Sequence, residues 1–164
     1  MNYKLIMALL GLGAATAVGL QSTEARTPAL GDTVCDMRWI VMTSPDGQNM
    51  LRIKAEEALD NATRRKGLMF RKEMPFDEGM IFYWAEPQPI YMWMKNTFIP
   101  LDMVFANDGK VTGVVEASET QSERVLTVEG NTDTVLEVNL GIATSKGVTA
   151  GWTIKPAGCV ENTQ

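Results

Sequence analysis

Five polar side chains in the middle of the chain are of types that bind a polar ligand. They are Arg71, Lys95, Asn96, Thr97 and Asp102. Asp102 lies within the apolar segment 101–105, and a buried carboxylate needs hydrogen-bonded or charged partners. We expect Lys95, Asn96 or an arginine to supply them. One interpretation is a cleft in which the five side chains converge on a ligand, and the other is a structural network that orders the 95–102 loop.

An enzyme that uses the same residues is an alternative. Lys95 beside Asp102 could supply a general base and the group that orients it. Glu137 is a further carboxylate in an apolar segment, and if it faced Asp102 at less than about 10 Å, acid–base chemistry on a sugar could follow. The chain contains no histidine, which excludes Ser-His-Asp and Cys-His mechanisms and His-ligated zinc. We therefore predict a binding or accessory module, with no catalytic residue and no cofactor, over an enzyme.

Methionine is frequent, with 11 in 164 residues. If residues 91–95 are extended, Met92 and Met94 point to the same face. Cu(I) is a soft ion that favours thioether ligands, so this pair defines a copper-site hypothesis. Methionine is also an adaptable filler of apolar cores. Core packing is the favoured interpretation, and a soft-metal site is the alternative.

The charge is acidic overall but unevenly distributed. The net charge of −5 argues against nucleic-acid or anionic-membrane binding, so the expected partner is a small polar ligand or a periplasmic protein. Residues 52–72 nevertheless contain seven basic and three acidic side chains. Arg64, Arg65 and Arg71 within this stretch define a candidate anion-binding surface. The alternative is a solvated helix face that complements acidic parts of the same molecule.

The four tryptophans are expected to be mainly core residues. Trp84 and Trp93 are the pair that we expect to line a pocket, because a tryptophan combines a large apolar surface with one polar N–H group.

Residues 1–25 have the pattern of a secretory signal. Lys4 precedes an uncharged, mostly apolar run from 6 to 20, and a short polar stretch ends at Ala25. The run is shorter than the roughly 20 residues of a comfortable membrane span. We therefore expect cleavage after Ala25, a periplasmic or secreted location, and no stable membrane insertion of the mature chain.

The two cysteines suit an oxidising compartment. Cys35 and Cys159 are predicted to form a disulfide that closes a loop of 125 residues. The chain-entropy model gives such a bridge a stabilisation of a little over ~4 kcal/mol. The alternative of a redox-active thiol has neither a CxxC pair nor a histidine to lower its pKa.

Alternating apolar residues and turn signals predict many short strands and one main helix. The helix is expected over 61–71 with Asp60 as its N-cap, and a hairpin turn over 107–110. The expected strands are 37–43, 50–55, 80–84, 91–95, 101–105, 111–115, 125–128, 135–140 and 148–154. This pattern predicts a mostly β (α+β) fold, a compact barrel- or sandwich-like sheet.

The segment from Arg64 to Asp102 carries a specific combination of motifs. GLMFR is followed by MP and, four residues on, by GM, and MWMKNT and PLDM come next. This combination resembles the domain-of-unknown-function family 192, a set of small, often exported bacterial and archaeal proteins with no established role. The similarity covers about residues 49–155. The resemblance implies a mostly β fold, an extracytoplasmic location and no assigned reaction.

These observations predict four parts of the chain. They are a signal peptide (1–25), an N-terminal leader with the first strand (26–48), a β-rich domain that resembles the family (49–155) and a C-terminal tail that contains Cys159 (156–164).

Overall fold

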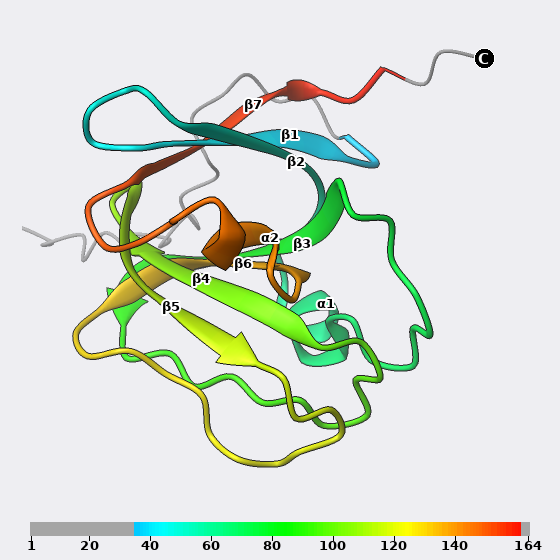
Figure 1. Ribbon diagram of the computed structural model, residues 1–164. Helices are drawn as coiled ribbons and strands as arrows, with labels where there is room; N and C mark the ends of the chain where they lie inside the picture. Colours follow the sequence, from blue (N-terminus) through cyan, green and yellow to red (C-terminus); the bar gives the residue numbers. More distant parts are fainter. Residues whose placement is uncertain (1–34, 162–164) are drawn as a thin grey trace, which may run out of the picture.

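The chain forms a closed barrel of seven strands (Figure 1). A computed structural model describes residues 35–161, so the expected signal peptide, 1–25, lies outside the described residues. The strands are β1 (Arg38–Thr43), β2 (Met50–Ala58), β3 (Glu78–Gln88), β4 (Leu101–Asn107), β5 (Lys110–Ala117), β6 (Thr132–Asn139) and β7 (Thr153–Cys159). Their order around the barrel is β1-β2-β3-β6-β4-β5-β7, and β7 pairs back with β1. The predicted mostly β architecture is confirmed, as a barrel.

Two short helices accompany the strands in the described part of the chain, α1 (Asn61–Lys66) and α2 (Ile142–Ser145). The predicted N-cap of α1 is confirmed, because an Asp60 carboxylate oxygen accepts the N–H groups of Ala62 and Thr63, both at 2.8 Å. The predicted end of this helix at residue 71 is wrong. Gly67 has φ 46°, a left-handed conformation that glycine adopts readily and that stops the helix. Neither helix has the length and apolarity to cross a membrane.

The hairpin between β4 and β5 follows from local turn chemistry. Asn107 pairs with Lys110, and the two residues between them, Asp108 and Gly109, have φ 48° and 70°. Positive φ at both central positions gives a tight two-residue turn whose twist matches that of the strands. The predicted hairpin at 107–110 is confirmed.

The predicted strands 91–95 and 125–128 are wrong. These segments belong to the β3–β4 and β5–β6 connections, which run along the same side of the barrel in Figure 1 and share a single bridge, between Met92 and Leu126. Both segments contain side chains that are buried against the barrel, such as Met94 and Leu126. Short apolar runs do not distinguish a strand from a buried loop, which explains the error.

The last strand begins later than expected, at Thr153 instead of 148, and runs to Cys159. It therefore includes Pro156, which pairs with Ile40 of β1. β7 pairs with β5 only through Thr153 and Lys110. Pro156 thus lies where β7 has one partner strand, a position at which a missing N–H is tolerated.

Side chains alternate between two apolar clusters, one inside the barrel and one on its outer face. The inner cluster draws on all seven strands and includes Ile40, Ile53, Ile81, Val104, Val111, Leu136 and Ile154. The outer cluster lies against β3, β4 and β6 and includes Leu68, Phe82, Met94, Met103, Phe105, Leu126 and Val135. Because loops cover this outer face, the central strands are buried on both sides, and a polar residue on either face is buried as well.

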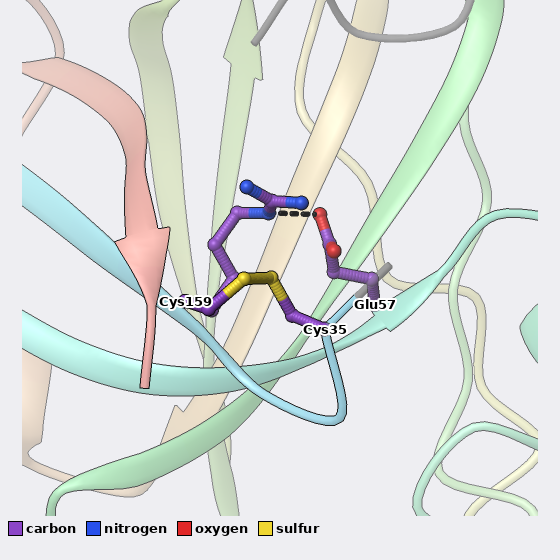
Figure 2. The surroundings of a disulfide bond; sticks show 4 residues. Cys35, Glu57 and Cys159 are labelled. Atoms are coloured by element: carbon purple, nitrogen blue, oxygen red, sulfur yellow. Dashed lines mark hydrogen bonds and ion pairs between the residues drawn. A yellow bond between two sulfur atoms is a disulfide. The ribbon is translucent and has the colours of Figure 1, made fainter. Parts of the chain in front are cut away.

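The predicted disulfide between Cys35 and Cys159 is confirmed. It joins the segment before β1 to the end of β7, so part of the predicted C-terminal tail belongs to the barrel. Figure 2 shows the carboxylate of Glu57 beside this bridge. Glu57 accepts a hydrogen bond of 2.8 Å from Arg38, and both side chains are at most 10% exposed.

Candidate functional site

Asp102 faces the interior of the barrel, where it caps α2. One of its carboxylate oxygens accepts the N–H groups of Ala143 at 2.9 Å and Thr144 at 3.1 Å, and the Thr144 hydroxyl at 3.3 Å. The residue is fully buried. These contacts give Asp102 a structural role that attaches α2 to β4.

The Lys95-Asn96-Thr97 run forms a turn on the other side of the sheet. The N–H of Thr97 donates to the carbonyl of Met94 at 3.0 Å, and Asn96 has φ 53°, which asparagine tolerates better than most residues. The Lys95 ammonium pairs with Glu123 at 3.0 Å, and both side chains are more than 40% exposed. Exposed pairs of this kind contribute little stability.

Arg71 is held by a different acid. Its guanidinium donates two hydrogen bonds of 2.6 Å to the two carboxylate oxygens of Glu56. Within residues 35–161, no hydrogen bond or ion pair joins Arg71 or Asp102 to the 95–97 turn. The expected convergence of the five side chains in one cleft is therefore not found, because Asp102 points to the inner face of β4 while the turn lies over the outer face. A ligand-binding role for these residues stays a prediction.

A cavity of about 280 Å³ lies over the outer face of β3 and β6. Of the five predicted residues, Thr97 lines it. The two tryptophans expected to line a pocket, Trp84 and Trp93, both do so. Phe82 and Trp84 stack with their ring centroids 6.4 Å apart and their planes at 20°. Part of the cavity wall is therefore aromatic.

Glu137 of β6 lines the same cavity and is 4% exposed. Its cross-strand neighbours are Met80 on β3 and Met103 on β4, so the sheet around it is apolar. Within residues 35–161, no hydrogen bond or ion pair reaches its carboxyl. Burial raises the pKa of Glu137 to about 8, because the charged form loses its hydration without a compensating partner. At neutral pH the carboxyl is protonated and able to donate a hydrogen bond.

Three consecutive basic residues of α1, Arg64, Arg65 and Lys66, also line the cavity. The Arg64 guanidinium is held by the carbonyls of Leu59 and Tyr83, both at 2.8 Å, and lies 5.6 Å from the centre of the Trp84 ring. Arg65 and Lys66 are exposed and have no hydrogen-bond or ion-pair partner within residues 35–161. The rim is thus positively charged.

Glu137 is the functional candidate that sequence reasoning undervalued. A signal was present, since Glu137 lies in the apolar run Val135–Val138. Apolar residues on both sides of a strand indicate a sheet covered on both faces, where a carboxylate must be buried. Its exposure to a cavity could not be seen, because the cavity is bounded by α1 and by the β3–β4 connection.

The methionines are mainly core residues. Met94 is 1% exposed, and Met74, Met80 and Met103 lie in the same outer cluster. Met92 lines the cavity. Within the described residues, no group of three His, Cys, Asp or Glu side chains is placed to hold a metal ion. The soft-metal site at Met92 and Met94 stays a prediction.

The comparisons with known proteins agree with this fold. The model of domain-of-unknown-function family 192, described as "Uncharacterized ACR", matches residues 41–156. A crystal structure from Sinorhizobium meliloti 1021, of a protein described as a proposed transcription regulator, is 34% identical with a TM-score of 0.70, over 78% of this chain and 99% of that one. A crystal structure of a protein of unknown function from Novosphingobium aromaticivorans DSM 12444 is 34% identical with a TM-score of 0.69, over 80% of this chain and 94% of that one. No curated protein matches the chain.

Proposed function

Since the chain belongs to the domain-of-unknown-function family 192, whose description assigns no activity, we propose a function from the geometry: an exported module that binds one small molecule in the Glu137 cavity. The observation that carries this proposal is a buried carboxyl, 4% exposed, that has no partner in the described chain and lines an open cavity. We therefore place the proposed polar site in the space between α1, β3 and β6, and not at the 95–102 loop expected from the sequence.

Energetics support a guest in this cavity. The Glu137 carboxyl lines the cavity and has no partner within residues 35–161. A ligand group that hydrogen-bonds to it there displaces no protein partner, so the carboxyl provides both affinity and orientation. A cavity of about 280 Å³ lies near the lower end of the range for small-molecule sites, roughly 300 Å³ and more. Its aromatic wall supplies apolar contact area, and Glu137 and Thr97 supply specific polar contacts.

The proposed location is periplasmic or secreted. The signal-like residues 1–25 and the Cys35–Cys159 disulfide support it, because such bridges persist in oxidising compartments. Expression of the full chain in a bacterium, followed by fractionation and intact-mass measurement, tests it. The expected product is a periplasmic or secreted protein that begins at Arg26, and a cytoplasmic protein of full mass would contradict export.

A fragment screen by ligand-observed NMR tests binding directly. We expect some fragments to bind and to change the fluorescence of the cavity tryptophans. Their affinity should fall at least tenfold when Glu137→Leu removes the carboxyl. Leucine suits the apolar surroundings of this position, so the variant should fold. Glu129→Leu, at an exposed position of the β5–β6 connection, is the matched control and should bind normally. Fragments that bind equally well to both variants would place the site elsewhere, and a screen with no binder would reject the proposal.

An enzyme is the second candidate function, and the pKa of Glu137 favours it. A group with a pKa of about 8 transfers protons efficiently near neutral pH, as general acid catalysis requires. Incubating the protein with each fragment that binds, and following the fragment by mass spectrometry, separates the candidates. Turnover that Glu137→Gln abolishes would establish an enzyme, whereas unchanged fragments support a binding module.

A further inference from the structure

We propose that the ligand of the Glu137 cavity is a small organic anion with a flat, apolar body, whose anionic group lies at the basic rim and whose inner end carries a neutral hydrogen-bond acceptor facing Glu137. This inference rests on the proposed binding function and names the chemical class of the ligand.

The charge of the ligand follows from the rim. Apart from Glu137, the titratable side chains that line the cavity are Arg64, Arg65 and Lys66 from α1 and Tyr91 from the β3–β4 connection. The lining residues from β3, Phe82 and Trp84, are not titratable. The local field is therefore positive. Arg65 and Lys66 have no partner within residues 35–161. A carboxylate or similar anion can therefore form ion pairs with both side chains without displacing a protein group.

The body of the ligand follows from the wall. Phe82 and Trp84, whose rings stack on each other, supply aromatic surface against which a flat ring packs well. The thioethers of Met69 and Met92 line the same space and adapt to the edge of such a ring. A volume of about 280 Å³ suits a single-ring molecule better than a nucleotide or a peptide.

The inner group follows from Glu137. A protonated carboxyl in apolar surroundings donates one hydrogen bond, so it pairs best with a carbonyl or hydroxyl oxygen. An ammonium group would need the ionised carboxylate, and the positive rim opposes a second positive charge. A neutral acceptor is therefore the matching group, and ionisation of Glu137 at high pH removes the donor. Above a pKa of about 8, affinity should fall by roughly tenfold per pH unit, up to the full contribution of this hydrogen bond.

Four benzene derivatives test the class, with affinities measured by calorimetry on the mature protein at pH 6.5. The probe 4-acetylbenzoate carries all the proposed features. Benzoate lacks the inner acceptor, 4-methylacetophenone lacks the anion, and 4-(aminomethyl)benzoate replaces the acceptor by an ammonium group. We expect 4-acetylbenzoate to bind at least tenfold more tightly than each of the others. An Arg65→Met, Lys66→Met double variant should bind 4-acetylbenzoate at least tenfold more weakly than the natural protein does.

The pH dependence provides the second measurement. The natural protein should bind 4-acetylbenzoate at least tenfold more weakly at pH 9.5 than at pH 6.5. Glu137→Gln, which keeps an N–H donor but does not titrate, should bind it with the same affinity at both values. Affinity that rises with pH, or a preference for the ammonium probe, would overturn the proposed class. If none of the four probes binds while fragments of other classes bind in the cavity, the class is wrong and the binding function stands. If no fragment binds at all, the binding function itself fails.

Discussion

Asp102 and Glu137 extend from adjacent strands at neighbouring positions, yet they lie on opposite faces of the sheet. In the pairing of β4 with β6, Asp102 is opposite Val138, and Met103 is opposite Glu137. Paired residues share a face and successive residues alternate. Asp102 therefore caps α2 within the barrel, whereas Glu137 lines the outer cavity. The condition for acid–base chemistry on a sugar, that the two carboxylates face each other, is therefore not met, and such a pair would have to reach one glycosidic bond from the same side of the sheet.

The raised pKa of Glu137 predicts a pH-dependent stability difference between the natural protein and Glu137→Gln. The folded state has a pKa of about 8, against an ordinary value of 4.5. The stability that the neutral form contributes is fully present below pH 4.5 and is lost as the pH rises to about 8, because the unfolded chain ionises first. Over this interval, the free energy of unfolding of the natural protein should fall by on the order of 4–5 kcal/mol relative to that of the variant.

Chemical denaturation at pH 4.5 and 8.5 measures this difference. Glu129→Gln, at an exposed position, should follow the natural protein at both values. If the free energies of unfolding of the natural protein and Glu137→Gln differ by the same amount at both pH values, the carboxyl ionises normally in the folded state.

Asp102 should matter for stability and not for ligand binding. Asp102→Ala leaves the N–H groups of Ala143 and Thr144 without their acceptor, at a cost of about 1–3 kcal/mol for the buried N–H of Ala143 and less for the partly buried one of Thr144. Asp102→Asn keeps one acceptor oxygen and should cost less, about 1–2 kcal/mol. Denaturation measures both costs, and calorimetry on the folded variants measures ligand affinity. An Asp102→Asn protein of normal stability that no longer binds ligand would restore the ligand-binding role expected from the sequence.

The Cys35–Cys159 disulfide should supply a large share of the stability. The cysteines are 124 residues apart in the sequence, so removing the bridge frees a long loop of the unfolded chain. The chain-entropy model predicts a loss of roughly 4–5 kcal/mol for the Cys35→Ser, Cys159→Ser double variant. Denaturation with and without reductant checks this value: reductant should bring the natural protein to the stability of the variant and leave the variant unchanged. Equal stability of oxidised and reduced protein would contradict it.

Gly79 should be required for the close approach of β3 to β6. A Cβ atom at this position would overlap the carbonyl oxygen of Glu137, and backbone cannot move aside as a flexible side chain can. Gly79→Ala should therefore cost about 1–3 kcal/mol and weaken ligand binding by displacing Glu137. Gly158→Ala is the matched control, because a Cβ there has no atom within 4 Å. Denaturation measures the stability of both variants. Equal losses of stability in the two would mean that β3 and β6 can separate without a cost in free energy.

Local chemistry made some elements predictable. The Asp60 cap and the 107–110 hairpin depend on hydrogen bonds and dihedral angles of residues that are adjacent in the chain, and both formed as expected. The 91–95 segment did not form the expected strand. Its apolar residues are buried by the outer face of the barrel, and sequence alternation cannot show whether a neighbouring strand or a neighbouring surface covers them.

The sequence by itself determined the family, the mostly β class and the disulfide between Cys35 and Cys159, because each depends on residue types, motif spacing or the number of cysteines. Only the tertiary structure decided the site. Closure of the barrel sent Asp102 inward and Glu137 outward, and α1 and the β3–β4 connection then enclosed Glu137 within a basic and aromatic cavity. The pKa of a carboxyl depends on hydration and on the charges around it in space, and those surroundings come from segments that are far apart in the chain.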